Sequence, residues 1–252
     1  MKNLRHAIIT AGTKGLGKQV SEYFLKKGYT LTINYRSDLE RLKTLKKEWQ
    51  AYANQYQFVQ GDITNKKDIV NIVNEAKKTF GRIDCLINNA GPFVFDKKPL
   101  VEYKDDEWYE MIEGNLSAIF HFAKLVIPIM RKQQFGRFIT YGFQDVEHSP
   151  GWTFRAAFTA AKVGLASLTR SIAKEEASYG ITANMVSPGD IKGYLKEIDI
   201  QTAKSLIDTN TPVGRAGSGE DIARVIAFLC EENSDFITGS IIPVSGGVHV
   251  IK

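Results

Sequence analysis

The segment Phe-Thr-Ala-Ala-Lys at 158–162 places a phenylalanine four residues before a lysine. On a helix, Phe158 and Lys162 share one face, so the ring and the ammonium group would lie side by side. An aromatic ring stacked against a lysine suggests a reactive pair, yet this ring has no hydroxyl and no acidic residue stands beside the lysine. The segment is either a reaction centre that lacks its proton donor or a stretch of ordinary helix, depending on what surrounds it.

Three glycines, Gly12, Gly15 and Gly17, stand in the sequence Thr-Ala-Gly-Thr-Lys-Gly-Leu-Gly at 10–17. They follow a short apolar run and open an amphipathic stretch. Glycine permits positive φ and lets a phosphate approach the backbone, while the start of the next helix offers free N–H groups with a partial positive charge. A strand before, a helix after and a second strand close behind predict dinucleotide binding rather than a plain turn.

The residues after the second apolar run indicate which dinucleotide is bound. An acidic residue there would bind the ribose hydroxyls of NAD, but this chain has Arg36 at that place and Lys14 in the glycine loop. Two cations suit a 2′-phosphate, which the planar guanidinium of Arg36 can bind through two hydrogen bonds. Asp38 lies close by and is the residue that would favour NAD(H). On balance the sequence predicts NADP(H) in preference to NAD(H).

Short apolar runs alternate with longer amphipathic ones along the chain. This alternation predicts an α/β fold, with a single doubly wound parallel sheet of the Rossmann type and helices on both faces. The runs are continuously apolar, as expected for strands buried on both faces. About seven strands are expected, at 6–10, 30–35, 56–60, 83–88, 136–141, 181–187 and 240–246. We expect one domain over 1–252, in which the irregular stretch 188–219 forms a lid over the ligand crevice.

Composition narrows the class of protein. The chain is 43% hydrophobic and 24% charged, which is ordinary for a soluble globular protein and excludes a disordered or fibrous one. The net charge is +5, but the basic residues are scattered, so nucleic acid is not an expected partner. Cys85 and Cys230 stand in apolar runs without a partner motif, which indicates buried, reduced thiols and no metal site. No signal peptide or membrane span is expected, and the predicted location is cytoplasmic.

Seven motifs in order resemble the short-chain dehydrogenase/reductase family, most closely the 3-oxoacyl-acyl-carrier-protein reductases. They are the glycine loop, Gly-Asp-Ile-Thr at 61–64, Asn-Asn-Ala-Gly at 88–91, Asn115, Lys162, Ser-Pro-Gly at 187–189 and the stretch 212–247. The resemblance covers essentially the whole chain. It implies NADPH-dependent reduction of a carbonyl, in a small molecule or an acyl thioester, by hydride transfer. Ala11 departs from the usual first glycine of the loop, which is tolerable if its φ is negative.

The resemblance also implies roles for individual residues. Lys162 would hydrogen-bond the nicotinamide ribose, and Asn115 would hold a helix distortion and a water that supplies protons. The glycine-loop residues implied to bind the cofactor are Gly12, Thr13, Lys14, Gly15, Leu16 and Gly17. The remaining cofactor residues are Arg36 and Ser37 after the second strand, Asp62 and Ile63 at the adenine, Asn89, Ala90 and Gly91 beside the ribose, and Pro188, Gly189 and Ile191 at the nicotinamide.

Both hydroxyls that the family uses on the substrate oxygen are missing. The resemblance implies a tyrosine acid four residues before the lysine and a serine after the fifth strand, and these positions hold Phe158 and Phe143. A shifted alignment does not help, because no tyrosine lies between 142 and 178 and the longer spacing of enoyl reductases falls on Arg155. Tyr141 is a candidate substitute donor; strand alternation puts it on the same face as Phe143, where it could equally well just pack.

Two functions therefore stay open. The first is an NADPH-dependent reductase that uses a substitute donor or a substrate that needs no tyrosine acid. The second is a catalytically impaired NADP(H)-binding protein of reductase ancestry, with a regulatory or scaffolding role. In either case Phe158 is expected to form an apolar wall of the site. Surplus apolar residues on the predicted helices 105–130 and 153–178 indicate a homodimer or homotetramer that assembles through them.

Overall fold

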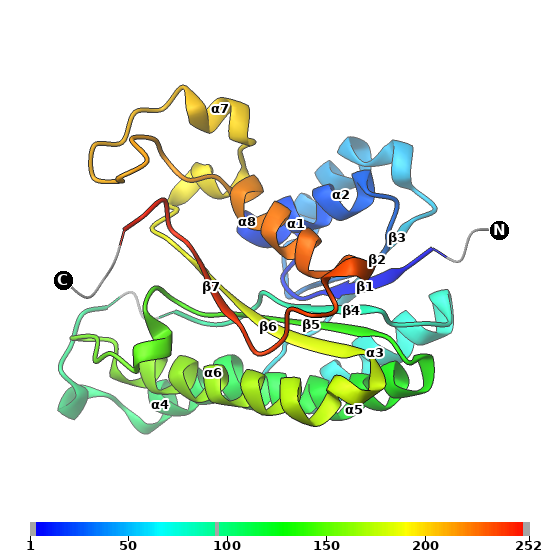
Figure 1. Ribbon diagram of the computed structural model, residues 1–252, viewed down its shortest axis with the longest axis horizontal. Helices are drawn as coiled ribbons and strands as arrows, with labels where there is room; N and C mark the ends of the chain where they lie inside the picture. Colours follow the sequence, from blue (N-terminus) through cyan, green and yellow to red (C-terminus); the bar gives the residue numbers. More distant parts are fainter. Residues whose placement is uncertain (1–3, 94–95, 249–252) are drawn as a thin grey trace.

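A seven-stranded parallel sheet forms the centre of the molecule (Figure 1). The computed structural model describes residues 4–93 and 96–248, so the predicted domain limits 1 and 252 lie outside the described residues. The strand order is β3-β2-β1-β4-β5-β6-β7, which confirms the predicted doubly wound parallel sheet. The strands are β1 (His6–Ile9), β2 (Thr30–Tyr35), β3 (Tyr56–Gln60), β4 (Cys85–Asn88), β5 (Gly136–Tyr141), β6 (Ile181–Pro188) and β7 (Ile241–Val244).

Helices cover both faces of this sheet (Figure 1). One face carries α1 (Gly15–Lys26), α2 (Leu39–Glu48) and α8 (Gly219–Leu229), and the other carries α3 (Lys66–Phe80), α4 (Asp105–Ile112), α5 (Ala118–Gln133) and α6 (Ala156–Glu176). The short helix α7 (Ile200–Lys204) lies beyond the carboxyl ends of the strands, within the stretch 188–219. Parallel strands that alternate with helices need this arrangement, because both faces of the sheet are apolar.

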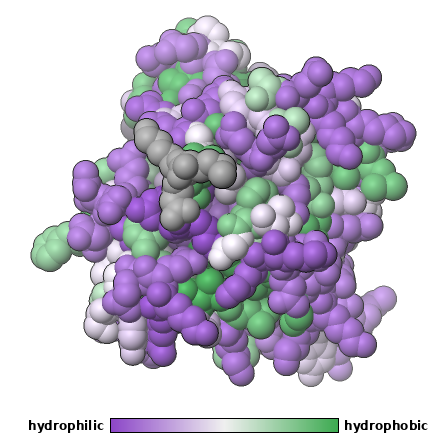
Figure 2. Space-filling model, turned by 90° about the vertical axis from the view of Figure 1, so that its right-hand side faces the viewer, coloured by the Kyte–Doolittle hydropathy of each residue, from purple (hydrophilic) through white to green (hydrophobic). Residues whose placement is uncertain are grey.

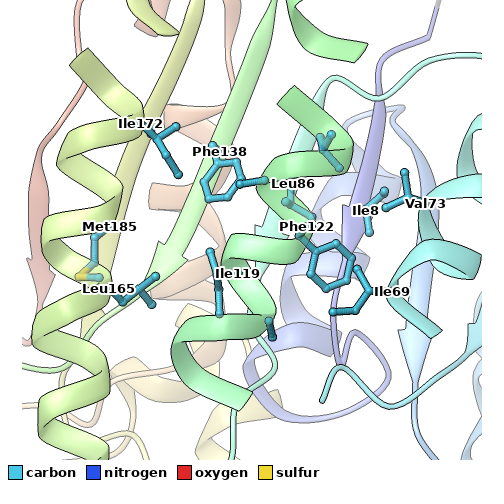
Figure 3. Close-up of a cluster of buried hydrophobic side chains, with 14 of the residues drawn as sticks. Ile8, Ile69, Val73, Leu86, Ile119, Phe122, Phe138, Leu165, Ile172 and Met185 are labelled. Carbon is cyan, nitrogen blue, oxygen red and sulfur yellow. The ribbon is translucent and has the colours of Figure 1, made fainter. Parts of the chain in front are cut away.

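The larger of two hydrophobic clusters fills the space between the sheet and helices α3, α5 and α6 (Figure 3). Helix α5 contributes Ile119, Phe122 and Val126, which recur at three- and four-residue spacing and so lie on one face. They meet strand residues such as Leu86 and Phe138, which are paired in register across β4 and β5. The second cluster lies on the opposite face, between the sheet and α1 and α8.

The helix predicted at 105–130 differs in detail from the structure. It consists of α4, a π-helical turn over Glu113–Ser117 and α5, which continues to Gln133. Gly114 lies inside this turn, and a Cβ there would come within 2.3 Å of the Pro92 ring, so only glycine fits. The helix distortion that the family resemblance implies at Asn115 is therefore present. The helix predicted at 153–178 begins later, at Ala156, and ends at Glu176.

The helical run Asp105–Gln133 is, by length and composition alone, long and apolar enough to cross a membrane. Its apolar face nevertheless packs against the sheet and α3, as a core helix does in a globular domain. Figure 2 shows the side of the molecule on which the chain begins, where hydrophilic residues cover most of the surface and hydrophobic ones form smaller groups. Burial within the fold accounts for part of its apolar composition, since 39% of its most apolar window is buried.

Candidate active site

The glycine loop connects β1 to α1 at the carboxyl edge of the sheet. Gly17 is required by close approach, because a Cβ there would lie 2.3 Å from the carbonyl oxygen of Ala11 and 2.6 Å from Nδ2 of Asn89. The Asn89 amide donates to the carbonyl oxygens of Thr10 and Ala11, at 3.0 and 3.2 Å. The predicted glycine loop and the Asn-Asn-Ala-Gly segment after β4 are thus brought together and hold each other in place.

The condition of a negative φ at Ala11, under which alanine would be tolerated without strain, is not met. Its φ is +48°, in the left-handed region that glycine adopts without strain. The Ala11 N–H donates to Oδ1 of Asn34 at 3.3 Å, and the neighbouring Gly12 N–H donates to the Asn34 carbonyl at 3.0 Å. These bonds to β2 and the bonds from Asn89 hold the strained backbone in place.

The predicted adenosine end lies where β2 and β3 finish. Arg36 is largely exposed there, with Nη1 3.9 Å from Oδ2 of Asp62, so both side chains face the same space. Asp38, the residue that would have favoured NAD(H), is the N-cap of α2. Its carboxylate accepts a hydrogen bond from the Arg41 N–H at 2.9 Å. Lys14 is exposed at the N-cap of α1. Ser37 lies between Arg36 and Asp38 and is exposed.

A further cation, Arg41, was missed in the sequence. It lies in the first turn of α2, and its Nε donates to the carbonyl oxygen of Thr13 in the glycine loop at 3.2 Å. Its guanidinium also forms an ion pair with Glu197, from the stretch 188–219. The available signal was a basic residue five positions after Arg36, but three lysines and an arginine in this helix resemble an ordinary solvated face.

Lys162 lies on α6 and is buried, with Nζ donating to the carbonyl oxygen of Tyr141 at 2.9 Å. Burial lowers the pKa of its ammonium group to about 8. The lysine nitrogen lies 5.7 Å from the centre of the Phe158 ring, so the pair shares one helix face as predicted. A buried lysine with one carbonyl partner keeps two further donors for other acceptors.

Asn115 lies in the π-helical turn, which packs against α6. Its amide nitrogen donates to the carbonyl oxygen of Pro92 at 2.9 Å, while its Oδ1 is buried and accepts no hydrogen bond from the described residues. A buried amide oxygen without a donor is costly unless a water supplies one. This orphan acceptor therefore fits the water that the family resemblance implies at Asn115.

Four aromatic rings surround the place where the family resemblance puts the serine and tyrosine hydroxyls. Phe158 lies 5.0 Å from Phe93 and 6.1 Å from Phe143, measured between ring centres, and Trp152 lies 6.2 Å from Phe158. Phe143 and Phe158 are buried, whereas Phe93 and Trp152 are about one-third exposed and face solvent. The Arg155 guanidinium lies over Phe93 at 4.8 Å. The arrangement is an apolar wall closed at its outer side by two partly exposed rings.

Tyr141 does not share a face with Phe143, contrary to the expectation from strand alternation. Its side chain packs in the second core cluster with Val186 and Ile191, whereas Phe143 packs in the first with Phe158. Strand β5 ends at Tyr141, so the period of two no longer applies at Phe143. The Tyr141 hydroxyl is buried and has no partner among the described residues, and burial raises its pKa well above the ordinary value.

The remaining predicted residues follow the carboxyl ends of β3, β4 and β6. Asp62 accepts from the N–H of Thr64 at 2.9 Å and Ile63 packs against the first core cluster. Pro188 ends β6, and the Gly189 N–H donates to the Val244 carbonyl at 2.9 Å. Together with the glycine loop and Lys162, the predicted residues thus gather along one edge of the sheet. Ala90 and Gly91 lie next to this edge. The Ala90 N–H donates to the Thr10 hydroxyl, and Gly91 lies against the Asn115 side chain.

The lowered pKa of Lys162 predicts how stability depends on pH. The unfolded chain holds this proton up to the ordinary pKa of 10.5, while the folded chain releases it near 8, so stability rises with pH between these values. We expect Lys162→Met to be more stable than the wild type at pH 7 by about 2 kcal/mol, because it removes a buried charge. Urea unfolding should show that the difference in free energy of unfolding between Lys162→Met and wild type is smaller at pH 10 than at pH 7. A constant or larger difference at pH 10 would contradict the buried charge.

Comparison with known proteins agrees with this geometry. Residues 10–249 match the family model described as enoyl-(acyl carrier protein) reductase. The chain is 61% identical to a Bacillus subtilis protein named "Putative oxidoreductase YtkK", over 99% of this chain and 98% of that protein. It is 33% identical to the 3-oxoacyl-[acyl-carrier-protein] reductase FabG of Haemophilus influenzae, over 97% of this chain and 98% of the other.

Solved structures show the same likeness over the whole chain. A "putative 3-oxoacyl-reductase" from Bacillus thuringiensis has a TM-score of 0.94 at 59% identity and covers 99% of this chain and 100% of its own. ElxO, solved with NADP bound, has a TM-score of 0.83 at 30% identity and covers 97% of this chain and 98% of its own. The chain belongs to the short-chain dehydrogenase/reductase family of oxidoreductases, close to the 3-oxoacyl-acyl-carrier-protein reductases.

Proposed function

We propose that this protein is a cytoplasmic NADPH-dependent reductase of carbonyl compounds, of the 3-oxoacyl-thioester type, that works without a side-chain hydroxyl on the substrate oxygen. NADPH, when bound, would supply the hydride. The chain would supply the binding site, the orientation of the reactants and a path for protons. Activity on simple ketones is then expected to be low. In the family a serine and a tyrosine hydroxyl contact the substrate oxygen, and this chain has Phe143 and Phe158 at those two positions.

The observation that carries this proposal is the set of anion-binding groups at the glycine loop. The Gly15 N–H at the start of α1 already donates to a carboxylate, from Glu197, at 2.7 Å. Lys14, Arg36 and Arg41 bring three positive side chains to the same edge of the sheet. A helix N-terminus flanked by cations is suited to phosphate, and three cations exceed what a neutral ribose diol requires.

The remaining predicted cofactor residues extend from this anion site along the carboxyl edge, as a long dinucleotide requires. We propose that Asp62 and Ile63 contact the adenine, that Asn89, Ala90 and Gly91 line the ribose, and that Pro188, Gly189 and Ile191 contact the nicotinamide. In the relative ElxO, NADP has been observed in the bound state, and a tyrosine-to-phenylalanine variant of ElxO has been solved with NADPH bound. Loss of a tyrosine hydroxyl is thus compatible with NADPH binding in that protein.

We propose that Lys162 and Asn115 retain their family roles. Lys162 has free donors for a ribose hydroxyl, and its burial fixes the position of the ammonium group. The Oδ1 of Asn115, which has no partner among the described residues, would hold a water, so that protons reach the site from solvent in place of a tyrosine. Tyr141 is a poor substitute donor, because its hydroxyl is buried on the face of the sheet opposite Phe143 and Phe158.

A second candidate is an NADP(H)-binding protein without turnover, with a regulatory or scaffolding role. The aromatic cluster favours it, since four rings fill the space around the missing hydroxyls and supply no proton. Losing a general acid and an oxyanion donor together costs about 10⁴-fold or more in rate. Both candidates share the cofactor site and differ in whether hydride transfer occurs.

We propose that the protein also forms a homodimer or homotetramer through α4, α5 and α6. Phe120 on α5 is 46% exposed, and Trp108 and Tyr109 on α4 are exposed as well. These aromatic side chains lie on the helices that the sequence marks as apolar on more than one face. Burial against a second copy of the chain would remove them from water.

Cofactor preference can be tested through Arg36. We expect Arg36→Gln to weaken NADPH binding by roughly tenfold and to leave NADH binding nearly unchanged, since a charge-assisted bond to a phosphate would be lost. A fluorescence titration of both nucleotides against both proteins measures this. Lys78→Gln, a charge change on the exposed side of α3, serves as the control. Equal loss for NADPH and NADH would show that Arg36 does not contact a 2′-phosphate.

A further inference from the structure

A carboxylate of the chain itself occupies the anion-binding end of the glycine loop. Glu197 ends a short 3-10 helix, Gly193–Glu197, in the stretch between β6 and α7. Its Oε1 accepts from the Gly15 N–H at 2.7 Å, and its Oε2 forms an ion pair with the Arg41 guanidinium. Arg41 in turn donates to the Thr13 carbonyl of the same loop. One carboxylate thus satisfies both the start of α1 and the cation beside it.

This contact belongs to a docked segment rather than to one mobile side chain. The Gln19 side chain on α1 donates to the Glu197 carbonyl at 2.8 Å, and the Lys196 side chain lies over Gly15. On the other side, a Cβ at Gly219 would come within 2.0 Å of the Lys196 carbonyl oxygen, so α8 admits the segment only because glycine stands there. The 193–197 segment is therefore held between α1 and α8.

A carboxylate and a phosphate compete for such a place. Both are anions that accept hydrogen bonds from backbone N–H groups, and both pair with a guanidinium. The Gly15 N–H has a single proton to donate, and a second anion against Glu197 would be repelled. A cofactor phosphate and the Glu197 carboxylate therefore exclude each other at this point.

We propose that Glu197 is an internal competitor for the cofactor phosphates, and that Arg41 is a phosphate-binding residue that becomes free when Glu197 is displaced. This inference rests on the proposed NADPH site. Glu197 would then lower the affinity for the cofactor, and Arg41 would raise it. The competition also couples cofactor binding to release of the 193–197 segment, in the stretch expected to cover the ligand crevice.

The test compares two charge-neutral variants by NADPH titration. Glu197→Gln keeps the shape and the hydrogen-bond acceptor but removes the charge that competes with phosphate. Glu220→Gln is the matched control, because Glu220 anchors the same stretch through the Ile200 N–H at 2.7 Å and, within the described residues, makes no hydrogen bond or ion pair to the glycine loop. We expect Glu197→Gln to bind NADPH roughly tenfold more tightly than wild type, and Glu220→Gln to bind within about twofold of wild type.

Two further measurements examine each half of the proposal. Adding Arg41→Gln to Glu197→Gln should abolish the gain in NADPH affinity. Amide hydrogen exchange over 193–199 should be faster in Glu197→Gln than in wild type without nucleotide, and NADPH should accelerate it in wild type.

The outcomes separate this inference from the function on which it rests. If wild type binds NADPH and Glu197→Gln binds it equally or more weakly, the competition does not exist and the proposed cofactor site stands. If the double variant Glu197→Gln, Arg41→Gln binds NADPH as tightly as Glu197→Gln does, Arg41 is not a phosphate ligand, and the proposed role of Arg41 is overturned. If neither wild type nor any variant binds NADPH, the cofactor site itself is wrong and the competitor with it.

Discussion

Phe158→Tyr combined with Phe143→Ser is expected to raise the rate of NADPH-dependent reduction of an acetoacetyl thioester by about 10³-fold or more. A positioned general acid contributes about 10² to 10⁴-fold and an oxyanion donor about 10² to 10³-fold. The Lys162 ammonium lies 5.7 Å from the Phe158 ring centre, close enough to lower the pKa of a phenol installed there. The double variant would therefore supply the proton donor that the proposed site, with Lys162 and Asn115, lacks.

Each single variant and one control complete this experiment. Phe158→Tyr alone should give most of the gain, and Phe143→Ser alone a smaller one, because a serine can hydrogen-bond the substrate oxygen but does not protonate it. Phe93→Tyr adds a phenol to the same aromatic cluster but not on α6 beside Lys162, and it should leave the rate unchanged. Failure of the double variant to exceed wild type, while it still binds NADPH, would show that more than the hydroxyls is missing. Measurable turnover by wild type favours the reductase, and none favours the NADP(H)-binding protein.

Asp84→Ala is expected to destabilise the fold by about 3 kcal/mol or more. Asp84 is completely buried at the amino edge of the sheet, just before β4. Its Oδ2 accepts from the His6 N–H at 2.8 Å and from Arg82 Nε at 2.7 Å, and its Oδ1 accepts from Arg82 Nη2 at 2.6 Å. Arg5 lies 3.6 Å away. Removing Asp84 leaves the buried His6 N–H without its acceptor, at about 1–3 kcal/mol, and takes the shared carboxylate from two arginines that are each about a quarter exposed.

An exposed ion pair of the same charge type is the matched comparison. Glu40 and Lys43 lie 2.7 Å apart on α2, and their side chains are 81% and 70% exposed. Glu40→Gln should change the free energy of unfolding by about 0.5 kcal/mol or less, because water screens the pair. Urea unfolding of both variants measures the difference. Similar losses for Asp84→Ala and Glu40→Gln would mean that Asp84 does not join β1 to β4 as the structure indicates.

Much of the fold could be predicted because burial leaves a periodic trace in the sequence. Strands such as β1, with Ala-Ile-Ile, and β4, with Cys-Leu-Ile, are covered on both faces, so they stand out as short apolar runs. The glycine loop was predictable for a different reason: Gly17 admits no Cβ where Asn89 and Ala11 approach. These constraints act within a few residues or along one element, and a sequence records them directly.

Other features depend on contacts that no local pattern contains. Tyr141 was assigned to the wrong face because β5 ends at that residue, and the end of a strand is set by its neighbours rather than by its own side chains. The left-handed φ of Ala11 is maintained by hydrogen bonds with Asn34 on β2 and with Asn89 in the loop after β4. Glu197 contacts Gly15 across 182 residues of chain, and the local sequence around either residue does not predict this contact.

The most direct test of the NADPH site is a calorimetric titration of the wild-type protein with NADPH and, separately, with NADH. Binding of NADPH with a micromolar dissociation constant, about tenfold or more tighter than NADH, is the expected result. Absence of heat with both nucleotides at millimolar concentration, or tighter binding of NADH, would contradict a site in which Arg36, Lys14 and Arg41 bind the phosphates of NADPH.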